Sequence, residues 1–587
     1  MTFKHLSNYF QKLEETTSRL KITEILANLF KEADADEIDK IVYLAAGRLL
    51  PAYEGLEFQM AEKTMIRAIA GAAGVEDRDV QKIYKELGDL GNAAEYLKKK
   101  SGGGKLQKTF FEKERKEKEE SVVEVYYRLT EIAKESGEGS VERKIGKMSV
   151  LLEDLDPLSV RFVVRIPLGR LRLGFSELTI LDALSWMIAG NKSLRGELED
   201  AYNVLADAGE IAKKIKEGGI AAIKKIKPKA GIPILPALAQ RLGTVEEMIE
   251  KMGEVAVEPK YDGERLQLHI KDGEVRLFTR NLENVTHMFP EIVEALKKEI
   301  RVKEAIFDSE GVGVDPKTGR FIPFQKTMTR KRKHGVKEAA MAIPFKCFIF
   351  DILLKDGVGL IEKPLLERRK ILEKVLSEKS EVLVLTPQIV TNDPEMVRRF
   401  HDEQIKKGLE GAMVKKTSAP YRPGRREFTW VKFKQEKTKK GGGLADTIDA
   451  VVMGTTRGKG KRVEFGVGTF LVGIRKGSKI VTISSIGTGL SDEQWREMYE
   501  RTQKYKTKEK PEIYDVNKDQ FPDTWIRPKV VVEIQADNIT ESPKNTSGYG
   551  LRFPRLIRFR DDKDVSQITT FEEFKHLYDL QFGYSKT

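Results

Sequence analysis

Cysteine is almost absent from this chain: Cys347 is the only one among 587 residues. A single cysteine excludes a disulfide scaffold and any Cys₄ or Cys₂His₂ zinc module. Apolar runs are also short, and none approaches the ~18 residues needed to span a bilayer. Residues 1–20 lack the apolar core of a secretory signal. These absences predict an intracellular protein in a reducing compartment.

Several signatures of nucleotide and metal sites are missing as well. The chain has no GxxxxGK[ST] loop, no GxGxxG after a predicted strand and no HExxH pair. Cys347 stands in the apolar run KCFIFDI, which argues against a nucleophilic role. The histidines are scattered, and we expect each to be structural or solvent-facing rather than a metal ligand: His5, His269, His287, His334, His401 and His576.

Charge, by contrast, is plentiful. Lysine plus arginine number 104 and aspartate plus glutamate 91, which gives a net charge of +13 and a pI near 9.2. Such a basic balance favours a polyanionic partner, and abundant lysine and glutamate are typical of heat-adapted proteins. With 587 residues, of which 40% are hydrophobic, the chain is long enough for about three or four packed domains.

Residues 1–228 read as mostly helical. In one segment Leu178, Leu181, Leu184 and Ile188 recur at helical spacing and predict one apolar stripe. Residues 98–120 break the pattern, because three glycines and dense charge indicate an exposed, flexible stretch.

From residue 229 onward short alternating runs replace the helical pattern. EVAVEPK, ERLQLHI and EVRLFT are separated by Asp262-Gly263 and Asp272-Gly273, and alternation broken by Asp-Gly predicts two hairpins. With helical runs interleaved, the region is typical of an α+β domain built around antiparallel sheet. The apolar residues of the second run are predicted to share one face: Leu266, Leu268 and Ile270.

Residues 434–443, KQEKTKKGGG, form a second glycine-rich and basic stretch that we interpret as a hinge. Beyond it, DTIDAVVMGTT, RVEFGVGTFLVGI, SKIVTISSIGTG and PKVVVEIQAD read as successive strands joined by glycine-rich turns. This pattern predicts a small β-barrel of the OB type.

The most informative segment is EPKYDGER, residues 258–265. Its KxDG core, Lys260 to Gly263, is weak evidence alone, since it could be a β-turn beside a solvated lysine. Its weight comes from further segments that follow in order. They place Arg280 in FTRN, Glu310 in FDSEGVG, Phe350 in FKCFIFDILLKDG, Glu410 in GLEGAMVKK, Arg426, Lys432 and Lys434 in RPGRREFTWVKFK, and Arg560 and Lys563 in RFPRLIRFRDDK.

This ordered set resembles the nucleotidyltransferase motifs I, Ia, III, IIIa, IV, V and VI of ATP-dependent DNA ligases of the archaeal and eukaryotic replicative type. RLRLGFSELTILDAL and IPILPALAQR are similar to parts of the family's DNA-binding domain and its junction. The chain departs from the family in DSEG, where DGE is commoner, and in LPALA, where PMLA is usual. The resemblance implies an all-α DNA-binding domain at 1–228, an α+β nucleotidyltransferase (adenylation) domain at 229–436 and an OB-fold β-barrel at 437–587.

The resemblance also implies an activity: sealing of single-strand nicks in duplex DNA during replication, repair and recombination. The implied intermediates are lysyl-AMP on Lys260 and adenylylated DNA, with ATP as nucleotide and Mg²⁺ or Mn²⁺ as metal. The implied partner is nicked double-stranded DNA, bound by a monomer with no membrane association. The expected location is cytoplasmic and nucleoid-associated, or nuclear in a eukaryote.

The family's residue roles transfer to matching positions here. Glu258 is expected to accept a hydrogen bond from adenine, and Phe350 to stack on it. Metal contacts are implied for Glu310 and Glu410, and the cations near Lys260 would favour a neutral amine there. ATP contacts are implied for Glu258, Arg265, Arg280, Glu310, Phe350, Arg426, Lys432, Lys434, Arg560 and Lys563. The last two would hold the β- and γ-phosphates, which requires the barrel to close and swing about the glycines at 441–443.

Two loops are candidate contacts with partners. Gln107, Phe110 and Phe111 lie in the charged stretch and look like a shortened peptide that binds the sliding clamp. The basic loop Thr327 to Gly335 is either a phosphate contact or merely solvated.

Four alternatives share part of this pattern, and a feature of the sequence argues against each. An mRNA-capping guanylyltransferase or an RNA ligase also uses KxDG, but usually without some 230 helical residues in front. An NAD-dependent ligase would normally carry a four-cysteine zinc site, which a single cysteine cannot make. A non-catalytic nick-binding scaffold would have no need of Lys260 and its companion motifs.

Overall fold

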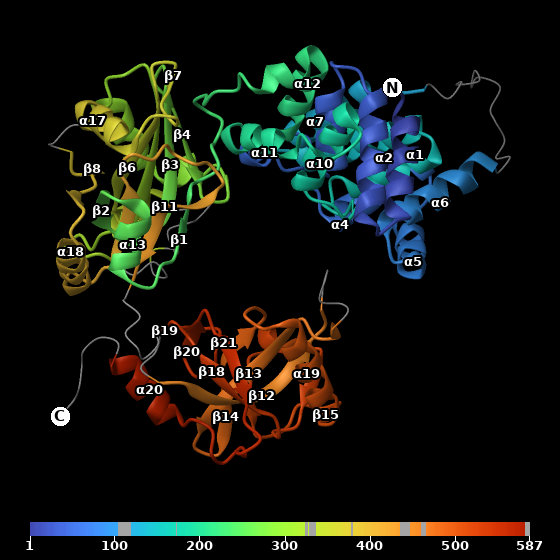
Figure 1. Ribbon diagram of the computed structural model, residues 1–587. Coiled ribbons are helices and arrows are strands. Elements are labelled where there is room, and N and C mark those ends of the chain that lie inside the picture. Colours follow the sequence, from blue (N-terminus) through green and yellow to red (C-terminus); the bar gives the residue numbers. More distant parts are fainter. Residues whose placement is uncertain are drawn as a thin grey trace. The chain divides into compact units, whose positions relative to one another are not determined.

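The computed structural model describes residues 1–103, 119–171, 173–322, 327, 336–376, 380–434, 446–458 and 465–580. The chain forms two compact units, Met1–Lys434 and Gln435–Thr587 (Figure 1). Gln107, Phe110, Phe111, the glycines at 441–443 and all but Thr327 of the basic loop lie outside the described residues. Within the described ranges, no helix combines the length and apolar character needed to cross a bilayer.

The first 228 residues are helical, as predicted, and the first strand of the described chain, β1, begins only at Leu238. Local signals start several helices: Ser121 and Glu124 form a capping box, and Asp156 caps a helix that begins with Pro157. The helices are α1 (Phe3–Glu14), α2 (Arg19–Glu32), α3 (Ile38–Ala45), α4 (Glu62–Ala73), α5 (Asp77–Leu87), α6 (Leu90–Gly103), α7 (Val122–Lys134), α8 (Ser140–Asp154), α9 (Pro157–Arg165), α10 (Glu177–Ala189), α11 (Arg195–Val204) and α12 (Ala208–Ile223).

The predicted apolar stripe of α10 is only half right. Leu181 and Leu184 are fully buried, whereas Leu178 is 47% exposed and Ile188 38% exposed. The buried face, which packs on α2, is centred on Ile180 and Leu184. Leu178 lies two positions before Ile180, and two positions turn a side chain to the opposite side of a helix.

Two sheets carry the region that follows. A five-stranded sheet has the order β1 (Leu238–Gln240), β11 (Arg426–Phe433), β10 (Ala412–Lys416), β2 (Val255–Pro259) and β9 (Ile389–Thr391). A six-stranded sheet has the order β4 (Glu274–Thr279), β3 (Glu264–Lys271), β5 (Glu304–Gly313), β6 (Phe345–Lys355) and β7 (Val358–Gly359), with β8 (Leu383–Leu385) also on β6. The pairs β1–β11 and β6–β8 are parallel, and the other pairs are antiparallel.

Helices cover one face of each sheet (Figure 1), and the opposite faces carry both polar side chains and a buried apolar cluster that includes Ile306 and Trp430. In the five-stranded sheet, Val257 and Val414 pack against α13 and α18. In the six-stranded sheet, Leu266, Leu268 and Ile270 share one buried face, as predicted. The helices of this region are α13 (Val245–Met252), α14 (Pro290–Glu299), α16 (Val336–Ala342), α17 (Leu365–Val375) and α18 (Pro394–Lys406).

Only one of the two predicted hairpins exists. Asp272 and Gly273 have φ of 47° and 83° and join β3 to β4 in a two-residue turn. Asp262-Gly263 instead carries the chain from β2 in one sheet to β3 in the other. Gly263 is required by close packing, because a Cβ there would lie 2.4 Å from the carbonyl oxygen of Gly311.

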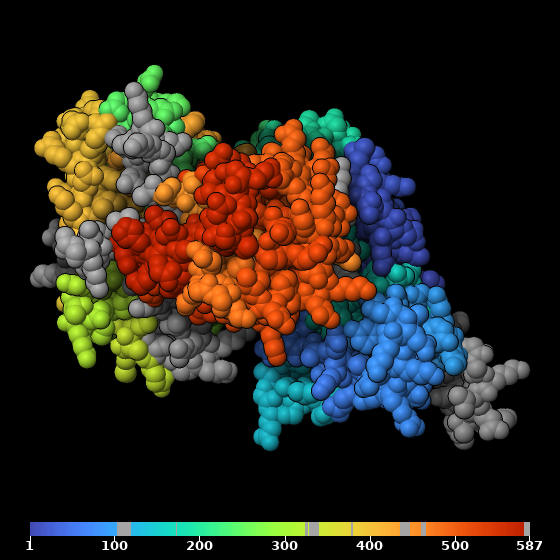
Figure 2. Space-filling model, turned by 90° about the horizontal axis from the view of Figure 1, so that it is seen from below, coloured from blue at the N-terminus to red at the C-terminus, as the bar shows by residue number. Residues whose placement is uncertain are grey.

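The C-terminal unit is rich in strands, and its described residues include the α-helices α19 and α20; Figure 2 shows it as a continuous orange-to-red body. Its main sheet has the order β15-β17-β12-β13-β14-β16, with β18 on β12 and β21 on β18. The end strands β15 and β16 do not pair with each other among the described residues, so a closed OB-type barrel is not confirmed. The elements are β12 (Ile448–Thr456), β13 (Thr469–Lys476), β14 (Lys479–Ile486), α19 (Asp492–Gln503), β15 (Lys506–Thr507), β16 (Tyr514–Asp515), β17 (Thr524–Ile526), β18 (Val531–Gln535), β19 (Asn538–Glu541), β20 (Tyr549–Arg552), β21 (Arg555–Phe559) and α20 (Phe571–Leu580).

Candidate active site

Strand register gathers the polar side chains of the two sheets. Glu258 on β2 lies opposite Met413 on β10, and Lys415 follows two residues later on the same face. On the other sheet Arg265 of β3 lies opposite Glu310 of β5. Glu258 and Lys415 on one sheet, and Arg265 and Glu310 on the other, lie on the face away from the helices of their own sheet. The apolar residues between them in the strands occupy the face that packs against those helices.

Lys260 lies directly after β2 and is held by the backbone of the neighbouring strand. Its N–H donates to the carbonyl of Gly411 at 2.9 Å, and its carbonyl accepts from the N–H of Glu410 at 3.1 Å. The Lys260 ammonium forms an ion pair with the Glu410 carboxylate, and Nζ of Lys434 lies 3.0 Å from the same oxygen, Oε2. The side chain of Lys260 is 20% exposed, so a substrate can reach it.

These contacts refine the predicted surroundings of Lys260. The sequence predicts cations around Lys260, and the structure brings Lys434 close but also places the Glu410 carboxylate in contact with the Lys260 ammonium. Lys260 has to leave this ion pair before its nitrogen can attack an electrophile. Lys432 of β11 lies opposite Met413 of β10 and adds a further positive charge near Lys260. Burial lowers the pKa of Lys432, and the neighbouring cations, including Lys260 and Lys434, lower it further.

Glu310 is the second carboxylate near Lys260. Burial raises the pKa of its carboxyl to about 7, although Lys260, Arg265 and an N–H from Gly263 favour the charged form. No cluster of three or more His, Cys, Asp or Glu side chains that could hold a metal occurs among the described residues. Glu310 and Glu410 nevertheless fit Mg²⁺, which takes one or two carboxylates and completes its shell with water and substrate phosphates.

Glu258 is buried, at 2% exposed, and both its carboxylate oxygens are occupied. Nζ of Lys415 lies 2.6 Å from Oε2, and Nε2 of Gln388 donates to Oε1 at 2.8 Å. Lys415 also lies 4.3 Å from the ring centroids of Phe350 and Trp430. The two predicted adenine contacts, Glu258 and Phe350, are therefore bridged by one buried lysine.

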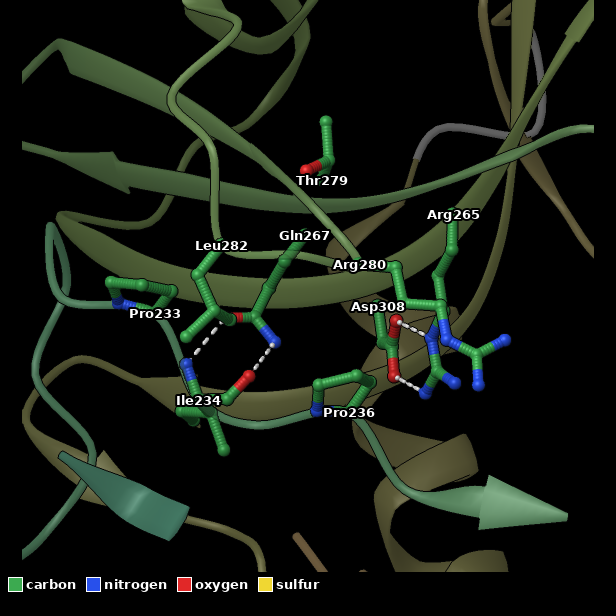
Figure 3. A pocket seen from close by; sticks show the side chains of 9 residues that line it. All are labelled: Pro233, Ile234, Pro236, Arg265, Gln267, Thr279, Arg280, Leu282 and Asp308. Atoms are coloured by element: carbon green, nitrogen blue, oxygen red, sulfur yellow. Dashed lines mark hydrogen bonds and ion pairs between the residues drawn. The ribbon is translucent and has the colours of Figure 1, made fainter. Parts of the chain in front are cut away.

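Arg265 contacts a buried aspartate rather than Lys260. Its Nε and Nη2 donate to the two oxygens of Asp308 at 3.0 and 2.6 Å, and Nη1 donates to the Ala237 carbonyl at 2.7 Å. Figure 3 shows this ion pair at one end of a small pocket, with Arg280 beside it. At the other end Gln267 exchanges two hydrogen bonds with the backbone of Ile234, at 2.8 and 3.1 Å.

The remaining predicted residues lie at strand ends beside this cluster or in the other unit. Arg280 and Arg426 are exposed, at the end of β4 and the start of β11. Arg560 and Lys563 belong to the C-terminal unit, where both contact Asp449 at 3.0 and 2.5 Å. Among the histidines, His269 is buried, and burial lowers its pKa to about 3.

Three family models match successive parts of the chain. The model described as DNA ligase N terminus matches residues 2–185, that of the ATP dependent DNA ligase domain residues 236–434, and that of the ATP dependent DNA ligase C terminal region residues 464–563. The chain is 43% identical to a probable DNA ligase of Dictyoglomus turgidum, over 98% of this chain and 97% of the relative. This chain belongs to the family of ATP-dependent DNA ligases.

Other similarities to DNA ligases also extend along the chain. DNA ligase 2 of Thermofilum pendens is 39% identical over 99% of this chain and 98% of the relative. A solved structure named Pmar-Lig_PreS3 covers 94% of this chain and 99% of its own, with a TM-score of 0.53 and 18% identity, which is a similarity of fold. The prediction of an ATP-dependent DNA ligase is confirmed.

Several residues that contact the predicted site residues were not predicted from the sequence, although two of them lie within the motif segments. Asp308 stands two residues before Glu310, and Lys415 five residues after Glu410. A lysine or aspartate inside an apolar strand was the available signal, because a buried charge requires a partner. Tyr421 and His401 carried no such signal; Nε2 of His401 lies 2.6 Å from the carbonyl oxygen of Lys434, at the end of β11.

Proposed function

We propose that this chain seals nicks in duplex DNA by covalent nucleotidyl transfer through Lys260. One observation carries the proposal: a partly exposed lysine next to a carboxylate that it shares with a second lysine. Nζ attacks the α-phosphorus of ATP, a P–N bond forms, the bond to pyrophosphate breaks and the amine loses its proton. AMP then passes to the 5′-phosphate of the nick, and the 3′-hydroxyl displaces AMP to close the backbone.

The surrounding charges suit such a reaction. Lys432 and Lys434 would offset the negative charge of the phosphates, which is most of what a protein contributes to phosphoryl transfer. Glu310 and Glu410 would hold Mg²⁺ or Mn²⁺, which supplies charge neutralisation at the phosphates when bound. Glu258 would accept a hydrogen bond from the adenine amino group while Phe350 covers the ring.

The DNA partner would be held chiefly through its phosphates. A net charge of +13 supports binding through the phosphates, and the affinity for DNA should fall steeply with salt.

Arg560 and Lys563 would contact the β- and γ-phosphates of ATP. This contact needs a C-terminal domain, of OB type in this proposal, that closes for the first step and swings away afterwards. We expect the chain to act as a monomer.

The test of the proposal is covalent labelling. The full chain is incubated with labelled ATP and Mg²⁺ or Mn²⁺, and parallel samples receive GTP, ADP or NAD⁺. A labelled adduct that Lys260→Ala abolishes supports the reaction, and Lys271→Ala, an exposed lysine at the end of β3, is the matched control. An adduct that survives in Lys260→Ala, or none in the unaltered chain, would refute it.

A sliding clamp is the second proposed partner, through Gln107, Phe110 and Phe111. Two adjacent aromatic residues in a polar stretch are what an apolar clamp pocket would bind. Phe110→Ala/Phe111→Ala is expected to lose clamp binding in a pull-down while nick sealing without the clamp is unchanged. Retained clamp binding in that variant would contradict the proposal.

A further inference from the structure

Tyr421 is a fully buried tyrosine whose hydroxyl lies among residues of the candidate site. It stands in the loop between β10 and β11, with none of its surface exposed. The hydroxyl donates to Oδ2 of Asp308 at 2.7 Å. It accepts from the N–H of Ala237 at 3.0 Å and from Nη2 of Arg265 at 3.2 Å.

These three bonds use the full capacity of the hydroxyl. A phenol has one hydrogen to donate and two lone pairs to accept with. Ala237 N–H and the Arg265 guanidinium are donors only, so the single hydrogen of Tyr421 must point to Asp308. The direction of every bond in the group is therefore determined, and no alternative arrangement of the hydrogen satisfies all three partners.

The same bonds hold the guanidinium of Arg265. Its five N–H groups include Nε to Asp308, Nη2 to Asp308 and Tyr421, and Nη1 to the Ala237 carbonyl. Four of the five are thus engaged, which leaves one N–H of Nη1 for a ligand. A guanidinium held at four points presents that last N–H in one direction only.

We propose that Tyr421 is a positioning residue for nucleotide binding, which acts through Asp308 and Arg265. The proposal rests on the proposed function, because it requires that ATP binds in this site and contacts Arg265, as the family resemblance implies. Without the hydroxyl, Ala237 N–H and Arg265 each lose an acceptor and Asp308 loses a donor. The guanidinium is then free to turn toward other acceptors, and its remaining N–H no longer meets the nucleotide in a fixed place.

The test uses Tyr421→Phe, which removes one oxygen and keeps the ring. Formation of the labelled lysyl adduct is measured against ATP concentration in the full chain. We expect the apparent KM for ATP to rise about tenfold, the usual scale for a lost hydrogen bond to a charged group. The amount of adduct at saturating ATP should be nearly unchanged, because Lys260 and its contacts are intact.

This readout separates positioning from general damage. Chains that are irreversibly misfolded lower the amount of adduct without changing the ATP concentration at half-saturation. Reversible unfolding would raise that concentration, so both chains are compared at a temperature where they are fully folded. The matched control is Tyr514→Phe, which removes the hydroxyl of a tyrosine that is 1% exposed and donates to the Ile526 carbonyl at 2.7 Å in the C-terminal unit. It should lose comparable stability and keep the KM of the unaltered chain.

Asp308→Asn keeps the proposal testable if Tyr421→Phe does not fold. Asp308→Asn weakens the acceptor of the same hydroxyl and is expected to raise KM in the same way. Arg265→Lys should raise KM too, and combining it with Tyr421→Phe should add little, because both act on one contact. An unchanged KM in folded Tyr421→Phe, or fully additive effects, would overturn the proposal. Absence of any adduct in the unaltered chain would instead refute the proposed function.

Discussion

Lys260 and Lys434 share one oxygen of Glu410. Lys434 lies 3.0 Å from Oε2, and Lys260 forms an ion pair with that same atom. One carboxylate therefore separates two ammonium groups, and the three side chains together carry a single net positive charge. An entering triphosphate brings its own negative charges, so it can replace Glu410 as the partner of both lysines.

Glu410→Gln should slow adduct formation on Lys260. The amide releases Lys260 from its ion pair, which alone would favour attack, but it is a much weaker ligand for a divalent cation. We expect the loss of that cation to dominate. We expect a loss of about 100-fold in the single-turnover rate with labelled ATP, the scale of removing one electrostatic group from an active site. Glu427→Gln, an exposed glutamate on β11, is the control and should keep the normal rate. A normal rate in Glu410→Gln would contradict this account of the cluster.

The stability of the chain should depend on pH through Glu310. Burial raises the pKa of this carboxyl from 4.5 to about 7, so the folded chain holds a proton that the unfolded chain releases. Stability linked to Glu310 is therefore fully present below pH ~4.5 and is lost as the pH rises to about 7. The loss amounts to about 3 kcal/mol.

The comparison with Glu310→Gln isolates this effect, because all other titrating groups cancel. The free energy of unfolding is measured by urea denaturation at pH 5 and pH 8 for both chains. We expect Glu310→Gln to gain stability relative to the unaltered chain at the higher pH. Glu274→Gln, exposed at the start of β4, should show no such gain. Identical pH dependence in all three chains would contradict the raised pKa.

The fold was predictable where local chemistry decides structure. The β3–β4 hairpin follows from Asp272-Gly273, because a two-residue turn needs positive φ at both positions. Asp262-Gly263 has the same residue types but joins two sheets, and the glycine is needed there because Gly311, distant in the sequence, approaches it closely. Packing of this kind depends on residues far away in the sequence, and no local pattern reports it.

The candidate site shows the same division. The order of the motifs allowed Lys260, Glu410 and Lys434 to be chosen from the sequence, and the structure brings their side chains together. Their other partners could not be chosen, because strand register decides which side chains meet. Tyr421 is the clearest case: its contacts with Asp308 and Arg265 join segments more than 100 residues apart.

Gly263→Ala should destabilise the chain and impair the site together. The new Cβ would lie 2.4 Å from the carbonyl oxygen of Gly311 and 3.0 Å from Cγ of Glu310. Overpacking of this kind costs about 1–3 kcal/mol, and the strand that carries Glu310 has to move. Thermal unfolding and adduct formation measure the two effects.

Gly146→Ala in α8 is the control for that substitution, since a Cβ there would have no neighbour within 4 Å. Alanine is favoured over glycine inside a helix, so this variant should be slightly more stable and fully active. If Gly263→Ala behaved like Gly146→Ala, the close approach to Gly311 would not be a constraint on the fold.

Arg560 and Lys563 should matter for the first chemical step and not for the last. Both contact Asp449, and Arg560 also contacts Asp562 at 2.7 Å, so the shared carboxylate holds the two cationic side chains next to each other in the C-terminal unit. Arg560→Ala or Lys563→Ala is expected to slow adduct formation with ATP by about 100-fold. Sealing of DNA that already carries AMP should be nearly normal, because no pyrophosphate leaves in that step. Arg558→Ala, a neighbour that pairs with Glu533 at 2.6 Å, is the control. Equal losses in the two assays would mean that these residues serve DNA binding or folding, since neither role distinguishes the steps.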